Sequence, residues 1–152
     1  MTGDARSALE AKAMAGDVAA QFELAVTFDR AGRRAEATSW MEAAATGGHT
    51  EALALLAAAD LQGLERPRDV ASAVDRLTRA VSLGGNAARR LLAVLTAVGM
   101  AGPTDWRKAV GLVMDAAKDG DFQALRELGL QIEMAAPNSP LADDLLLRAG
   151  LL

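Results

Sequence analysis

The chain has 152 residues, of which 51% are hydrophobic and only 3% aromatic, and its formal net charge is −4 with a pI near 5.0. An acidic chain lacks the basic face that neutralises phosphates, which argues against nucleic-acid binding. The absence of cysteine excludes disulfides, thiolate metal sites and cysteine nucleophiles, and it fits a reducing cytoplasm.

The start of the chain predicts neither secretion nor membrane insertion. The first six residues, Met-Thr-Gly-Asp-Ala-Arg, contain no basic segment followed by an apolar one, as a signal peptide would. No uncharged apolar run approaches the ~18–20 residues that span a bilayer. We therefore expect a soluble, cytoplasmic protein without membrane contact.

One pattern recurs four times along the chain: Gly, three residues, Ala, three residues, Leu. The glycines are 48−16 = 32, 84−48 = 36 and 120−84 = 36 residues apart. A period in this range indicates stacked supersecondary units. We therefore predict one repeat domain over 1–152, with an N-terminal capping helix over 1–15 and repeats over about 16–47, 48–83, 84–119 and 120–152.

Each repeat is predicted to hold two helices. The first helix follows the repeat glycine, because the Ala and the Leu four residues later lie on one helical face. Its copies are expected over 17–31, 49–62, 86–99 and 121–135. The second helix precedes the next glycine, and Asp69, Asp105 and Ser139 near prolines mark the later starts. The glycines between pairs suit left-handed helix ends.

The C-terminal end is strongly apolar for a terminal repeat. Residues 145–152 read Leu-Leu-Leu-Arg-Ala-Gly-Leu-Leu, whereas terminal repeats normally carry a polar outer face. With Ala149 in the register of Ala80, the next repeat glycine falls at 149+4 = 153, one residue past Leu152. Either the chain continues into a longer protein, or its last helix packs on a partner; a naturally short apolar capping helix is the simpler alternative.

Together these residues resemble the Sel-one-like repeats, which are relatives of the tetratricopeptide repeats. The first unit fits that family best, with Gly16, Ala20, Leu24, Phe28, Ala37, Trp40, Ala44 and Gly48 in place. The later units depart from the pattern, because Arg76 and Leu112 stand at the tryptophan position. The resemblance implies an all-α fold, a right-handed α-solenoid of antiparallel helix pairs, with the first helices lining a concave surface. In bacteria such repeats are often joined to other domains.

No catalytic, cofactor or metal residues are predicted. His49 is the only histidine, so a His-based metal cluster or catalytic triad is nearly excluded. Its position at the start of the helix over 49–62 suits helix initiation instead. No glycine-rich turn after a strand predicts a phosphate site. We expect that this chain alone is not an enzyme.

The candidate partner-binding residues are polar side chains of the first helices that lie off the Ala/Leu face. Trp106 joins them because it lies off the repeat's tryptophan position. The alternative for each is an ordinary solvated position. The candidates are Gln21, Glu23, Thr27, Arg30, Glu51, Arg89, Arg90, Trp106, Gln123, Arg126, Glu127 and Gln131.

The predicted function is a scaffold or adaptor that binds a protein or peptide partner on the concave face. The alternative is an N-terminal interaction or dimerisation domain of a larger enzyme, such as an iron/2-oxoglutarate oxygenase, with its catalytic domain beyond residue 152. The partner would then be a downstream domain of the same polypeptide. A homodimer through the C-terminal apolar helix is a further prediction.

Overall fold

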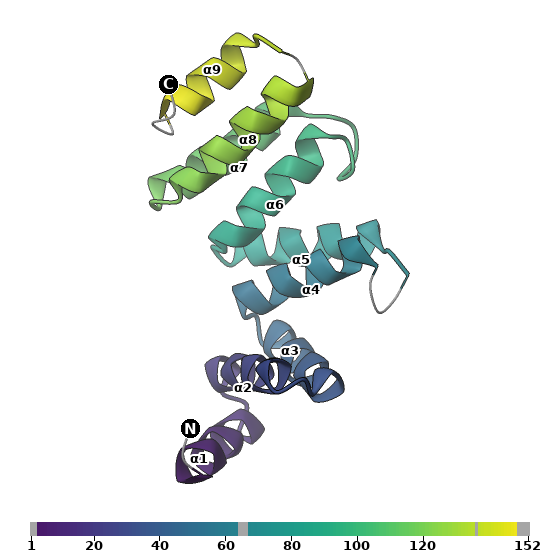
Figure 1. Cartoon of the computed structure of the whole chain (residues 1–152), viewed down its shortest axis with the longest axis vertical. Coiled ribbons are helices and arrows are strands. Elements are labelled where there is room, and N and C mark those ends of the chain that lie inside the picture. Colours follow the sequence, from purple (N-terminus) through teal and green to yellow (C-terminus); the bar gives the residue numbers. More distant parts are fainter. Residues whose placement is uncertain (1–2, 64–66, 136, 149–152) are drawn as a thin grey trace.

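The computed structural model describes residues 3–63, 67–135 and 137–148 of the chain. These residues form nine α-helices and no strand, stacked in chain order along one long axis (Figure 1). The all-helical prediction is therefore confirmed for them, whereas the predicted register of residues 149–152 lies outside the described residues. The helices are α1 (Gly3–Met14), α2 (Val18–Arg30), α3 (Arg34–Thr46), α4 (Thr50–Gln62), α5 (Val70–Ser82), α6 (Asn86–Ala97), α7 (Trp106–Lys118), α8 (Phe122–Ala135) and α9 (Pro140–Arg148).

The helices pack as pairs, and the pairs stack in two layers. Helix α2 packs on α3, α4 on α5, α6 on α7 and α8 on α9, while α1 packs on the start of the stack against α2. Helices α4 and α6 also contact each other, as do α6 and α8. We call the helices that follow the repeat glycines the inner layer and α3, α5, α7 and α9 the outer layer; within the inner layer, α6 contacts both α4 and α8.

The repeat glycines connect one pair to the next. Gly16, Gly48, Gly84 and Gly120 have φ angles of +91°, +93°, +87° and +91°, as predicted for left-handed helix ends. The neighbouring Gly47 serves a second purpose, since a Cβ atom there would lie 2.5 Å from Val18 Cγ2. The lack of a side chain at these junctions therefore allows both the turn and the close approach of successive pairs.

Two of the predicted N-caps, Asp69 and Asp105, hold the starts of α5 and α7. Asp69 Oδ1 accepts a hydrogen bond from Ser72 N at 3.0 Å, and Asp105 Oδ1 accepts one from Lys108 N at 2.9 Å. His49 caps α4 in the same way, because its Nδ1 accepts from Ala52 N at 3.3 Å. The His49 ring also stacks on Phe22 of α2, with 4.1 Å between the ring centroids. The structural role predicted for the only histidine is therefore confirmed.

The Ala and Leu residues of the repeat pattern supply the core of every pair. All eight are buried, from Ala20 and Leu24 in α2 to Ala124 and Leu128 in α8. They pack in three successive clusters along the stack rather than around one centre. Burial of apolar surface thus stabilises each pair mainly through its immediate neighbours, as in other repeat proteins.

Candidate interaction surface

The inner layer presents one face of each of its helices to solvent. At 3.6 residues per turn, positions 3, 7, 10 and 14 after a repeat glycine lie away from the buried Ala and Leu at positions 4 and 8. None of the sixteen side chains at these positions is buried. We name this surface the inner face: Ala19, Glu23, Val26 and Arg30; Glu51, Leu55, Ala58 and Gln62; Ala87, Leu91, Val94 and Val98; Gln123, Glu127, Leu130 and Met134.

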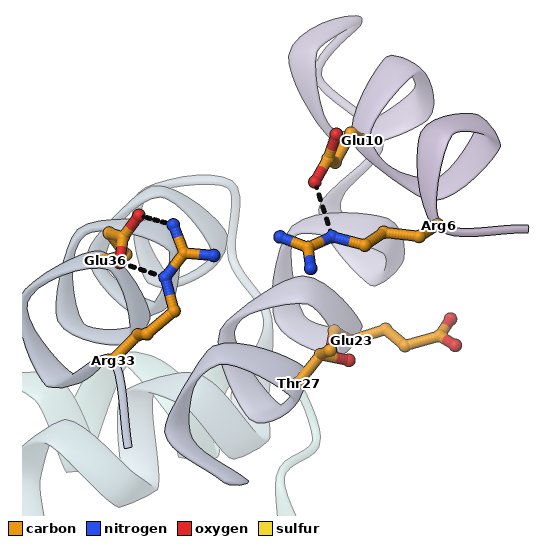
Figure 2. Close-up of polar contacts among 6 residues, drawn as sticks. All are labelled: Arg6, Glu10, Glu23, Thr27, Arg33 and Glu36. Carbon is orange, nitrogen blue, oxygen red and sulfur yellow. Dashed lines mark hydrogen bonds and ion pairs between the residues drawn. The ribbon is translucent and has the colours of Figure 1, made fainter. Parts of the chain in front are cut away.

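Five of the predicted partner-binding residues lie on the inner face. Glu23, Arg30 and Glu51 are exposed, and their side chains make no hydrogen bond or ion pair within the described residues. Figure 2 shows Glu23 beside Thr27 on α2, with its carboxylate pointing away from the helix. Gln123 and Glu127 bond to each other, with 2.9 Å between Nε2 and Oε1. The unpaired charges therefore gather on α2 and α4.

Two other predicted partner-binding residues donate side-chain hydrogen bonds to backbone carbonyls. Gln21 Nε2 donates to Ala13 O at 3.1 Å, which ties α2 to α1. Thr27 Oγ1 donates to Glu23 O at 2.9 Å, within its own helix. Each side chain already uses one polar group inside the protein.

The arginine pair of α6 holds two successive repeats together. Arg89 forms an ion pair with Asp119, in the turn between α7 and α8. Arg90 lies with its Nε 3.1 Å from Glu127 Oε2 and its Nη1 3.9 Å from Asp121 Oδ2. Both arginines are half-buried, and their acidic partners neutralise them. Replacing them would therefore disturb the stacking of α8 on α6 as well as any ligand contact.

The remaining predicted residues are spread over the third and fourth repeats. Trp106 begins α7 and packs half-buried against the apolar cluster around Ala109 and Val113. Arg126 is exposed on α8. The side chain of Gln131 lies outside the described residues.

The sequence reasoning missed the apolar residues of the inner face. Leu55, Val98, Leu130 and Met134 are 47%, 48%, 42% and 79% exposed. A signal was present for three of them, because Leu55, Val98 and Met134 occupy positions 7 and 14 after a repeat glycine, which hold Glu23 and Arg30 in the first repeat. With the partly exposed residues of α6 they form an apolar strip across α4, α6 and α8: Leu55, Leu91, Val94, Val98, Leu130 and Met134.

A cavity of about 280 Å³ lies between α3, α4 and α5, away from the inner face. It is slightly smaller than the roughly 300–1,000 Å³ of small-molecule sites. Its residues Glu42 and Arg76 are bonded to each other. Among the described residues, no cluster of three or more acidic or histidine side chains could hold a metal ion. The described helices also include none with the length and apolarity to cross a membrane.

The comparisons with known proteins agree with this geometry. No protein-family model matches the chain, and no curated protein matches it. A solved Sel1 repeat protein from Oxalobacter formigenes matches with a TM-score of 0.75 and 28% identity, over 80% of this chain and 95% of that one. A protective antigen of uropathogenic Escherichia coli with an SLR fold matches with a TM-score of 0.77 and 24% identity, over 95% of this chain but only 32% of the antigen. At that identity the antigen shows the fold alone, a right-handed α-solenoid of antiparallel helix pairs.

A third solved structure is closer in sequence. It is described as a sel1 repeat protein from Klebsiella pneumoniae subsp. pneumoniae, and it matches with a TM-score of 0.71 and 31% identity. The match covers 95% of this chain and 73% of that one. This likeness agrees with the glycine-separated helix pairs and with their buried Ala and Leu residues. The chain belongs to the Sel1 repeat family, whose units are the Sel-one-like repeats.

Proposed function

We propose that this protein is an adaptor that binds a protein or peptide partner on its inner face. The observation that carries the proposal is the inner face itself, where sixteen side chains from four stacked helices all remain accessible. Packed helices hold these side chains in fixed relative positions, so a partner meets a preorganised surface. The Sel1 repeat neighbours support the same scaffold function. No catalytic group is needed for it.

A selection experiment tests the proposal. Peptides are selected from a displayed library against the purified chain, and their affinities are measured for a variant in which Glu51→Lys and Leu130→Asp alter the inner face. Both residues are exposed, so the variant should melt at the same temperature as the unaltered chain. We expect the selected peptides to bind it at least tenfold more weakly.

The matched control alters the outer layer. Arg107→Glu reverses an exposed charge on α7, and binding should be unchanged. Selected peptides that tolerate the inner-face variant but lose affinity for the Arg107→Glu variant would move the interaction surface to the outer layer.

A second proposal concerns the C-terminal end of the stack, where two large apolar side chains are exposed. Phe122 of α8 and Leu147 of α9 are both largely exposed. Thr50 holds the position of Phe122 in the second repeat, two residues after the repeat glycine. There it packs against Gly85, in the junction to the third repeat. We propose that a second copy of the chain covers this end. Light scattering should then give twice 15.7 kDa, and Leu147→Glu should return the mass to 15.7 kDa.

The alternative of a larger enzyme stays a prediction. It requires a catalytic domain beyond residue 152, and the length of the native protein tests it. The same repeat block could serve as its interaction domain.

A further inference from the structure

The inner face has two chemically distinct parts. The apolar strip runs across α4, α6 and α8, and Leu91 within it packs against the core cluster that joins α4, α5 and α6. Because α4 contacts α6 and α6 contacts α8, the strip is continuous from one repeat to the next. Packed helices lie about 8–10 Å apart, so a partner crossing the strip needs roughly six extended residues.

The other part lies on the first turn of α4 and on α2, which is joined to the start of α4 where Phe22 stacks on His49. Glu51 lies one helical turn before Leu55, and Glu23 lies at the equivalent position to Leu55 on α2. Both carboxylates are exposed, and neither has a hydrogen-bond or ion-pair partner in the part of the chain that the structure describes. Glu127, at the same position on α8, is already paired with Arg90. The unbalanced negative charge therefore lies at the α2–α4 end of the strip.

The positive charges near this end do not cancel it. Arg30 lies seven residues after Glu23, which is about 10 Å along the helix axis. Arg126 lies on α8, at the opposite end of the strip. The chain as a whole carries a net charge of −4, so its field adds to the local one.

We infer that the inner face binds a short peptide segment in which apolar side chains follow a basic end. The inference rests on the proposed function and names the chemistry of its partner. The apolar side chains cover the strip, and the Lys or Arg residues meet Glu51 and Glu23. Apolar contact provides most of the affinity, whereas the carboxylates set the direction of the segment and reject acidic ones.

Calorimetry with three capped synthetic peptides tests the inference on the full chain. The first reads Lys-Lys-Leu-Ser-Leu-Ser-Leu, the second replaces both lysines with glutamates, and the third replaces the leucines with serines. We expect the first to bind at least tenfold more tightly than either of the others at low salt. The difference between the first and second should shrink as salt rises, because exposed charges are screened.

Two pairs of variants sharpen the test. Met134→Ser removes a 79% exposed side chain from the strip, and Met14→Ser removes a 76% exposed side chain from α1. We expect Met134→Ser to weaken the binding of the basic peptide at least fivefold and Met14→Ser to leave its affinity unchanged. Glu51→Gln keeps the shape of the side chain but removes its charge, so it should reduce the preference for lysine over glutamate. Gln123→Glu adds a carboxylate at the equivalent position of α8, and it should not reduce the preference, because added negative charge also attracts lysine and repels glutamate.

Two results would overturn the inference. One is equal binding of the basic and acidic peptides, and the other is the same affinity for the Met134→Ser and Met14→Ser variants. The library selection then separates the two proposals. Acidic or polar peptides that still lose affinity for the inner-face variant would leave the adaptor function standing and remove this inference. Selected peptides that are all insensitive to that variant would remove both.

Discussion

The first and second helix pairs solve the same packing problem with opposite chemistry. Twelve residues after the repeat glycine, α2 carries Phe28 and α4 carries Asp60. Eight residues before the next glycine, α3 carries Trp40 and α5 carries Arg76. An aromatic pair in the first repeat therefore corresponds to an acid–base pair in the second.

In the first helix pair, apolar side chains form the contact, and two arginines lie beside it. Phe28 is buried in a cluster with Leu9 of α1, and Trp40 packs partly buried against it. The guanidinium carbons of Arg6 and Arg33 lie 5.5 and 4.4 Å from the centroid of the Phe28 ring. Figure 2 shows each arginine bonded to a glutamate of its own segment, Glu10 or Glu36.

In the second pair an arginine joins three helices. Arg76 Nε of α5 lies 3.0 Å from Asp60 Oδ2 of α4, and its two terminal nitrogens donate to Glu42 of α3 at 3.0 and 3.1 Å. Asp60 is only 7% exposed. The hydrogen bonds that Arg76 donates to Glu42 raise the pKa of the Arg76 guanidinium, against the opposing effect of its burial.

The comparison shows what the repeat requires at this position. Either an apolar pair or a matched ion pair is accepted, because both leave no uncompensated polar group in the core. The ion pair needs its two partners together, since a buried carboxylate without its cation is costly. The aromatic pair has no such mutual dependence, and its stability comes from buried area and dispersion.

The largest effect should come from the aromatic side. Phe28→Ala removes a buried ring and leaves a cavity between α1, α2 and α3, at a cost of about 4 kcal/mol of unfolding free energy. Urea denaturation measures it. Met14→Ala is the control, because Met14 is 76% exposed and its loss should cost less than about 0.5 kcal/mol. Equal costs would mean that the Phe28 cluster contributes little to the first pair.

The next effect should come from breaking the ion pair. Arg76→Ala leaves Asp60 buried without its cation, and we expect a loss of about 3 kcal/mol, the lower limit for buried pairs because Arg76 is partly in solvent. The same denaturation experiment on Arg126→Ala, which removes an exposed arginine, provides the comparison. A similar loss in both variants would contradict the dependence of Asp60 on Arg76.

Replacing both members of the pair should cost little. In the double variant Asp60→Leu with Arg76→Leu, no buried charge remains, and Glu42 stays solvated at the surface. We expect its stability to lie within about 1 kcal/mol of the unaltered chain. A double variant as unstable as Arg76→Ala alone would show that the second repeat needs these charges themselves.

The smallest expected change in stability concerns Asp69, the N-cap of the helix that carries Arg76. Hydrogen bonds from the backbone and side chain of Ser72 hold the pKa of Asp69 below its ordinary value of 3.8. A lowered folded-state pKa stabilises the fold above the unfolded value, and this stabilisation is lost as the pH falls through the folded value. The melting temperatures of the unaltered chain and the Asp69→Ala variant should therefore differ at pH 7 and converge below about pH 4.

Asp75→Ala removes an exposed carboxylate from the same helix and serves as the control. Its difference from the unaltered chain should change less between pH 7 and pH 3. A gap between the unaltered chain and the Asp69→Ala variant that stayed constant with pH would argue against the cap as its cause.

The sequence by itself determined the local features of this protein. Helix starts at Asp69, Asp105 and His49 depend on atoms three residues away, so the residues alone indicate them. The left-handed junction glycines and the buried Ala and Leu residues follow from spacing in the same way. These features repeat four times, which is why the order of the helix pairs could be predicted.

Only the tertiary structure decided how distant side chains meet. Arg76 reaches Glu42 across 34 residues, and Arg89 reaches Asp119 across 30, so neither pairing has a local sequence signal. The apolar strip likewise takes its side chains from three helices, and isolated exposed leucines have no meaning until stacking aligns them. Hydrogen bonds within a helix turn need only the local chain, whereas charge pairing and surface continuity depend on the angle and distance at which the repeats stack.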